Sequence, residues 1–145
     1  MIVQQALDDR AQIGGRREIE KDLLPAAQEY KLGLLPFFPL ASGLLTGKYQ
    51  RGAAVPDDTR FAKMPALRDR YATPRNEDIV EKLQAFAEKR GHTMLELAFS
   101  WLASRPQVAS VIAGATRVEQ VEQNVKAIDW ALSAEDLAEI DGITK

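Results

Sequence analysis

Short apolar runs and longer helical periods alternate along this chain. The runs at 1–5, 34–38 and 108–113 predict strands. The run that begins at Leu34–Leu35 is typical of a strand buried on both faces, as in a parallel sheet that helices cover, and 108–113 is predicted as a buried strand. Apolar residues three or four positions apart predict helices between these strands. The predicted helices cover residues 17–31, 77–90, 93–104, 116–128 and 133 onward.

This order of strands and helices indicates a parallel α/β sheet rather than a helical bundle. Three capping boxes support the helix starts, at Thr93–Glu96, Thr116–Glu119 and Ser133–Asp136. Segment 49–75 contains a glycine and three prolines but no clean period, so it is predicted as a long surface loop. Loops of that length in compact domains are more often functional than idle.

Composition excludes several classes of function. The chain has 145 residues, enough for one domain, with 46% hydrophobic and 28% charged residues. A net charge of −2 gives no reason to expect nucleic acid or an anionic membrane as partner. With no cysteine there is no disulfide, thiolate metal site or thiol nucleophile, and we assign no metal ligands. No apolar run spans a bilayer and the first residues lack a signal-peptide layout, so we expect a cytoplasmic protein.

The segment most suggestive of chemistry is 34–48, where an apolar strand runs into a glycine-rich loop closed by Lys48. Gly43 and Gly47 let the backbone approach an anion closely, and the lysine adds a charge, so a nucleotide diphosphate is the expected ligand. A Walker A loop is the competing interpretation. It fails because Ser42 stands where its first glycine belongs and Tyr49 where its Ser or Thr belongs.

A second predicted anion site lies at 111–124. There a strand, a turn at Gly114 and a helix start follow one another. The free amides of the first helical turn and the positive end of the helix dipole both favour an anion at such a turn.

Both segments resemble the aldo-keto reductase family. Phe37–Lys48 is similar to the stretch that follows barrel strand seven in that family, and only Phe38 departs from it, where a small residue is more usual. Segment 111–124 is similar to the eighth strand and the helix that grips the adenosine end of the cofactor. The resemblance extends over about residues 17–142 and is weak before Arg17.

The resemblance implies the C-terminal part of a (β/α)8 TIM barrel. A complete barrel takes roughly 250 residues, so this chain can supply only about half to two-thirds of one. We therefore expect a poorly matched segment at 1–16, followed by the barrel portion at 17–145 with its long loop at 49–75. Gln4 or Gln5 is the candidate for the family's glutamine that binds the nicotinamide carboxamide, although residues 6–9 do not continue the pattern.

The cofactor implied by the resemblance is NADP(H). Phe37 would stack on the nicotinamide, or else be a core residue; Lys48 would contact the cofactor, or be a solvated charge. Arg117 is the sole cation of its turn, so charge discrimination for the 2′-phosphate of NADPH would rest on it. The predicted cofactor-binding residues are Phe37, Pro39, Leu40, Ser42, Gly43, Thr46, Lys48, Gly114, Ala115, Thr116, Arg117, Gln120, Gln123 and Asn124.

No catalytic residue is assigned. The family's catalytic Tyr, Lys, Asp and His lie on the first half of the barrel, which the resemblance does not reach. His92 falls in a turn between two predicted helices, most consistent with the stability face of a barrel, and neither Tyr30 nor Tyr49 falls at a strand end beside a lysine and an aspartate. The parent reaction would be hydride transfer between NADP(H) and an aldehyde or ketone, with 49–75 contacting the small-molecule substrate.

Two other functions stay open. One is a non-catalytic module that binds a nucleotide or a partner chain, as the related potassium-channel beta subunits bind partners. The other is a truncated gene product without activity. Because part of a barrel leaves strand edges uncovered, we also expect self-association or pairing with a complementary half-barrel.

Overall fold

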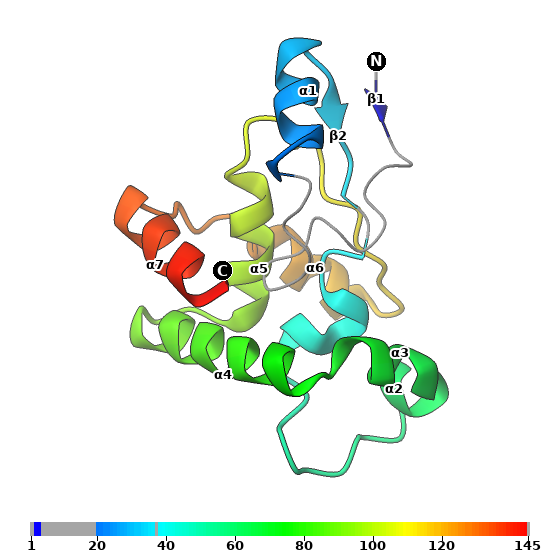
Figure 1. The fold of residues 1–145 in the computed structure, drawn as a ribbon. Coiled ribbons are helices and arrows are strands. Elements are labelled where there is room, and N and C mark those ends of the chain that lie inside the picture. The colour runs from blue at the N-terminus through cyan, green and yellow to red at the C-terminus, as the bar shows by residue number, and fades with distance from the viewer. Residues whose placement is uncertain (1, 4–19, 37, 145) are drawn as a thin grey trace.

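The computed structural model describes residues 2–3, 20–36 and 38–144 (Figure 1). The described part is mostly helical. Its elements are β1 (Ile2–Val3), α1 (Leu23–Glu29), β2 (Gly33–Leu34), the 3-10 helix η2 (Ala41–Thr46), α2 (Arg60–Lys63), α3 (Pro65–Tyr71), α4 (Pro74–Lys89), α5 (Met94–Ala103), α6 (Val118–Lys126) and α7 (Ala134–Thr144).

Three parallel segments lie side by side in chain order. β1 pairs with β2, with Val3 opposite Leu34. Segment 107–112 runs along the other side of β2, where the Leu34 amide donates to the Gln107 carbonyl (2.7 Å) and the Ala109 amide donates to the Leu34 carbonyl (2.9 Å). A parallel arrangement is therefore present, as predicted, but the described residues form no closed barrel.

The predicted strands are longer and more buried than the observed ones. β2 ends at Leu34, which is 1% exposed, whereas the prediction ran to residue 38. Segment 108–113 forms a single bridge to β2 instead of a regular strand, and its residues are half-buried or exposed. The prediction of a buried strand is wrong there, because β2 is its sole neighbouring strand among the described residues and α6 buries no side chain.

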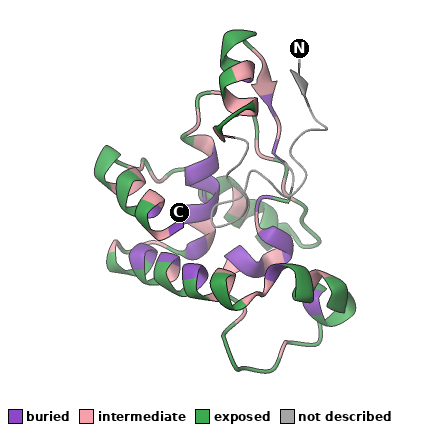
Figure 2. Cartoon of the chain, viewed as in Figure 1, coloured by how far each residue is buried: buried purple, intermediate pink, exposed green. Residues whose placement is uncertain are grey.

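The main core lies between α4, α5, α7 and η2. Leu83 of α4, Leu97 of α5 and Ile140 of α7 are all fully buried in it. Figure 2 shows buried residues on the sides of α4, α5 and η2 that face one another. A smaller cluster joins α1 to the sheet through Ala27 and Leu34. The predicted helix 17–31 is shorter as observed, since α1 begins at Leu23 and residues 17–19 lie outside the described residues.

Two of the three predicted capping boxes are confirmed. Thr93 Oγ1 accepts from the Glu96 amide (3.2 Å) and Glu96 Oε2 accepts from the Thr93 amide (2.6 Å). Ser133 and Asp136 make the same reciprocal pair. The prediction of a box at Thr116 is wrong, because α6 starts one residue later than such a box requires and the side chain of its N-cap residue accepts no capping hydrogen bond.

Segment 49–75 is not the structureless loop that its sequence predicts. It contains α2 and α3, and Phe61 of α2 is buried with its ring stacked on Tyr49 at 4.3 Å between centroids. Tyr71 at the end of α3 is buried too. Helices of four and seven residues are too short to show a hydrophobic period, and such short helices depend on tertiary packing rather than on propensity.

The Thr93 box provides a test of helix capping and acid stability. Replacing Thr93 by Ala is expected to lower the free energy of unfolding by about 1 kcal/mol, because the side-chain acceptor for the Glu96 amide is lost. Urea unfolding at neutral pH measures this loss. An unchanged midpoint would show that the box contributes nothing.

The pH dependence of the same box follows from Glu96. Hydrogen bonds from the Thr93 backbone, and then from its hydroxyl, lower the pKa of Glu96. This contribution to stability is complete above the unfolded-state pKa of about 4.3 and is lost as the pH falls through the lower folded-state pKa. The free energies of unfolding of Thr93→Ala and of the parent chain should therefore differ less in acid than at neutral pH. A difference that grows on acidification would contradict this.

Candidate cofactor-binding site

The two predicted anion-binding segments start from neighbouring positions at one end of the parallel segments. The Ile112 amide donates to the Pro36 carbonyl (3.0 Å), so the ends of these parallel segments are adjacent. The loop containing η2 follows Pro36, and the turn leading to α6 follows Ile112. Ligand sites of α/β folds lie at such carboxyl ends of parallel strands. The fold thus brings the two halves of the predicted site to the same end of the parallel segments.

The first loop has an unusual backbone. Phe38, Ala41 and Ser42 all have positive φ angles, of 55°, 46° and 58°. Residues other than glycine rarely adopt positive φ angles, and such conformations cluster at functional sites. Gly43 follows with φ 99°, and Gly47 ends η2 with φ 77°. The local strain makes this loop the best candidate for a binding function in the described chain.

Lys48 folds back over Gly43. A Cβ atom at Gly43 would lie 2.9 Å from Lys48 Cε and 3.0 Å from Lys48 Nζ, so the glycine leaves the room that the ammonium group uses. Lys48 Nζ also lies 5.2 Å from the centroid of the Tyr49 ring. The lysine therefore holds its charge beside the Gly43 backbone.

Hydrogen bonds within the loop use some of the groups that the prediction reserved for an anion. The Gly43 amide donates to the Leu40 carbonyl (2.8 Å), and so does the Leu45 amide (3.2 Å). The Thr46 hydroxyl donates to the Gly43 carbonyl (2.7 Å). These bonds fix the shape of the loop. An anion here would be held by the Lys48 ammonium rather than by the Gly43 amide.

The second turn is organised by Gln120. Its Oε1 accepts from the Thr116 amide (2.8 Å) and from the Thr116 hydroxyl (3.2 Å). The side chain thereby bridges the turn and the first turn of α6, in place of the predicted threonine cap. Gln120 thus has a structural role that its sequence context did not predict.

Arg117 reaches across to the segment that follows the first loop. Its Nη2 lies 3.7 Å from Asp58 Oδ2, and the two side chains are 68% and 73% exposed. Exposed pairs of this kind contribute little to stability. The contact nevertheless links the second turn to segment 49–75, through Asp58, a residue that the sequence analysis does not select.

The other predicted residues differ in exposure between the two halves. In the first loop Pro39 and Ser42 are buried and Leu40 is half-buried. In the second turn, the exposed predicted residues are Gly114, Ala115, Thr116, Arg117, Gln120 and Gln123, with Asn124 half-buried. Phe37, Gln4 and Gln5 lie outside the described residues.

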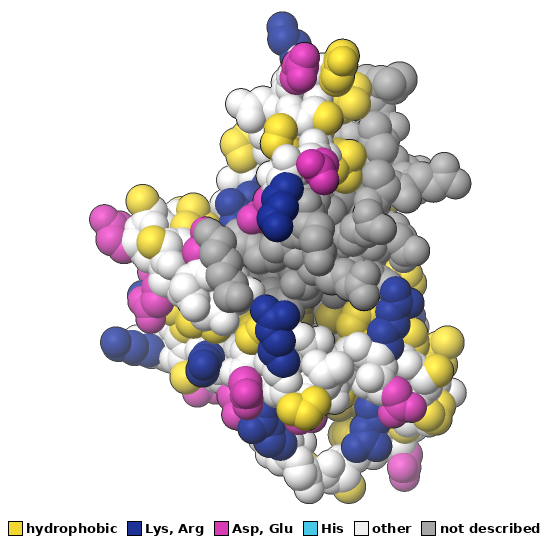
Figure 3. All heavy atoms as spheres, viewed as in Figure 1, with side chains coloured by type: hydrophobic (Ala, Val, Ile, Leu, Met, Phe, Trp, Pro, Cys, Tyr) yellow, Lys and Arg dark blue, Asp and Glu magenta, His cyan; other side chains and the backbone are white. Residues whose placement is uncertain are grey.

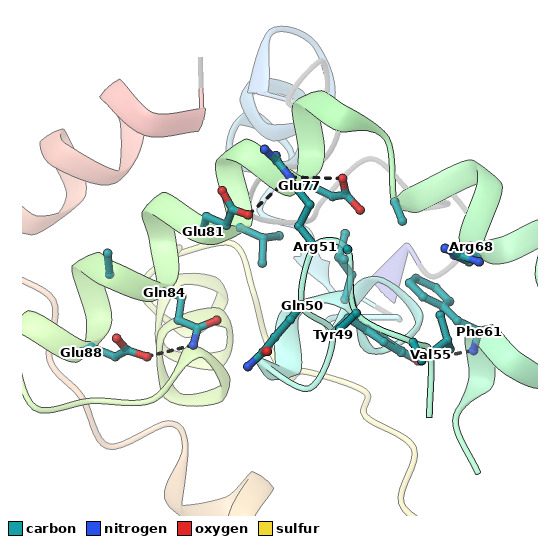
Figure 4. Close-up of a pocket in the computed structure, with 17 residues that line it drawn as sticks. Tyr49, Gln50, Arg51, Val55, Phe61, Arg68, Glu77, Glu81, Gln84 and Glu88 are labelled. Carbon is teal, nitrogen blue, oxygen red and sulfur yellow. Dashed lines mark hydrogen bonds and ion pairs between the residues drawn. The ribbon is translucent and has the colours of Figure 1, made fainter. Parts of the chain in front are cut away.

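A cavity of about 480 Å³ lies beside the first loop, against α4. Leu44, Tyr49 and Phe61 contribute apolar side chains to it (Figure 4). Arg51 lies across its wall, with Nε 3.4 Å from both Glu77 and Glu81. A hydrogen bond from Arg51 also lowers the pKa of Asp78. None of the predicted cofactor-binding residues lines this cavity, so it is a separate hollow, formed mainly by 49–55 and α4 with Leu44, Phe61 and Arg68.

His92 has a packing role. Its ring stacks on Trp130 with 4.0 Å between centroids and an interplanar angle of 8°, in the turn between α4 and α5 as predicted. Its Nδ1 lies 3.6 Å from Glu96 Oε1. Within the described ranges, no cluster of His, Asp and Glu is arranged to hold a metal ion.

The surface gives no single-sign patch on the face seen in Figure 3, where Lys and Arg are interspersed with Asp and Glu. In the described chain, every helix is too short or too polar to cross a bilayer.

Comparison with known proteins places the two segments in a family context. The sequence model of the Aldo/keto reductase family matches residues 6–145. A probable voltage-gated potassium channel subunit beta of Arabidopsis thaliana is 40% identical over 121 residues, 79% of this chain. The L-glyceraldehyde 3-phosphate reductase of Escherichia coli O157:H7 is 40% identical over 124 residues, 82% of this chain.

A solved structure also resembles this chain. The glycerol dehydrogenase of Gluconobacter oxydans superposes with a TM-score of 0.68 at 30% identity, over 86% of this chain and 38% of that one. The chain spans only about a third of the length of the relatives, 35% for both curated proteins.

Proposed function

Because the chain belongs to the aldo-keto reductase family, we propose that it forms the part of an oxidoreductase that holds the pyrophosphate and adenosine end of NADP(H). The parent reaction is hydride transfer between this cofactor and a small aldehyde or ketone. The observation that supports the proposal is the Ile112–Pro36 hydrogen bond, because it joins the ends of the two parallel segments from which the predicted anion-binding loops start.

The residues present fit a dinucleotide. Lys48 stands over Gly43 in a space that a Cβ would fill, so its ammonium is placed for a pyrophosphate oxygen. Arg117 is highly exposed and makes one weak ion pair that a 2′-phosphate can replace. Bound there, the cofactor supplies the hydride. This chain's own residues bind and orient it, with Gln123 and Asn124 toward the adenosine and segment 49–75 toward the substrate.

A partner-binding module is the second candidate. The Arabidopsis relative named as a potassium channel subunit beta is 40% identical, as is the reductase, so identity does not separate the two functions. The exposed apolar face of α6 favours a partner. A chain that shows no response to NADPH would exclude the cofactor role and leave the partner-binding module.

Arg117→Ala tests the cofactor site. We expect this variant to bind NADPH at least about fivefold more weakly, with a smaller change for NADH, because a charge-assisted contact to the 2′-phosphate is lost. Titration of cofactor fluorescence measures both affinities. Lys126→Ala is the matched control, since it removes the same charge from the other end of α6. Equal losses for NADPH and NADH, or an equal effect of Lys126→Ala, would remove Arg117 from this role.

A further inference from the structure

The cavity between segment 49–55 and α4 has the size and the apolar surface of a small-molecule site. Its volume of about 480 Å³ falls within the range of about 300–1,000 Å³ that is typical of ligand pockets. Tyr49 and Phe61 line it with their rings stacked at 4.3 Å between centroids. Leu44 and Val80 contribute buried apolar side chains to the lining. An aromatic or aliphatic group therefore finds an apolar surface to lie on.

Acidic side chains of α4 form the opposite wall. Glu77, Glu81 and Glu88 all line the cavity, and Figure 4 shows them in a row along the helix, away from the aromatic pair. Their spacing of four and seven residues puts them on one side of α4. Gln84 lies in the same row, and its Nε2 donates to Glu88 Oε1 (2.8 Å). The cavity thus has an apolar side and an anionic side.

Arg51 does not use the full hydrogen-bonding capacity of this wall. Its guanidinium donates to Asp78 and to the Pro74 carbonyl (3.2 Å). Its Nε lies 3.4 Å from both Glu77 and Glu81. Charge-assisted hydrogen bonds are shorter, at about 2.7–2.9 Å, and one N–H group cannot form a full-strength bond to two carboxylates. The two glutamates therefore keep acceptor oxygens for a second cationic donor.

The remaining charges of the lining select the sign of a ligand. The hydrogen bond to Asp78 matches the charge of Arg51, and Arg68 is the other cation among the described lining residues. The three glutamates outnumber it. A carboxylate or phosphate in this cavity would meet like charges, whereas a cation would reduce their mutual repulsion.

We propose that this cavity binds a small organic cation, an aromatic or aliphatic body that carries one ammonium, amidinium or guanidinium group. The body packs on the stacked rings of Tyr49 and Phe61, and the cationic group hydrogen-bonds to Glu81 in the acidic wall. None of the residues that line this cavity belongs to the proposed cofactor site, so the inference does not depend on binding of NADP(H).

Benzamidine tests the charge preference, because it joins an aromatic ring to an amidinium group and neutral benzamide has nearly the same shape. At millimolar concentration, benzamidine is expected to shift the NMR signals of the Tyr49 and Phe61 rings saturably, with benzamide binding about threefold or more weakly. Glu81→Gln should weaken benzamidine binding by about threefold or more and leave benzamide binding unchanged, because only the cation loses a partner. Glu122→Gln is the matched control, since it removes the same charge from an exposed position on α6.

Ala85→Phe tests the cavity itself. Ala85 lines the cavity from α4 and is exposed, so a larger side chain there fills the space without entering the core. This variant should lose benzamidine binding, and thermal unfolding of each variant checks that the fold is intact. The proposal is overturned by an absence of saturable shifts, by equal binding of benzamide, by an equal effect of Glu122→Gln, or by undiminished binding to Ala85→Phe. NADPH titration of the same variants reports on the cofactor site separately.

Discussion

Replacing Leu97 by Ala is expected to destabilise the folded chain by about 2–5 kcal/mol. Leu97 is fully buried on α5, in the core that also holds Leu83 and Ile140. Removal of its isobutyl group loses the transfer free energy and leaves a cavity that close-packed neighbours refill only partly. Domains are stable by about 5–15 kcal/mol in total, so this one change removes a large part of the whole.

Urea unfolding followed by circular dichroism measures the loss. Met64→Ala is the control, because that side chain is of similar size but 52% exposed, and surface changes of this kind stay within about 0.5 kcal/mol. Equal effects of the two substitutions would mean that α5 is not the centre of the core.

The 145-residue chain by itself is expected to show no carbonyl reduction with NADPH. Positioned acid catalysis contributes about 10²- to 10⁴-fold, and no described tyrosine is placed as the proton donor. Tyr49 is held in a stack with Phe61, and its hydroxyl accepts from the Phe61 amide (3.3 Å). Tyr30 follows the end of α1 and is 69% exposed, and Tyr71 is the buried last residue of α3.

The measurement is NADPH oxidation with simple aldehydes, beside a mock purification from cells that lack the chain. Turnover above that control would show that this chain carries an acid catalyst of its own. Activity that appears only on co-expression with the amino-terminal part of the Escherichia coli L-glyceraldehyde 3-phosphate reductase would instead indicate that the two chains form one barrel together.

Features set within a few residues could be predicted from the sequence. The boxes at Thr93–Glu96 and Ser133–Asp136 formed because each cap and its partner lie three residues apart. Gly91 has φ 77° and ends the turn after α4, as a glycine there predicts. The glycine loop before Lys48 and the turn before α6 were recognisable too, because each carries its whole pattern in one short stretch.

Contacts between distant parts of the chain needed the tertiary structure. α2 and α3 form because the side chains of Phe61 and Tyr71 are buried against the rest of the chain, and no local hydrophobic period indicates this. Arg117 contacts Asp58 of segment 49–75, and Gln120 rather than a threonine organises the second turn. The sequence by itself determined the family, the parallel order and two of the three predicted caps. The fold alone decided which loops meet and which face of α6 stays bare, since burial depends on neighbours that local spacing does not encode.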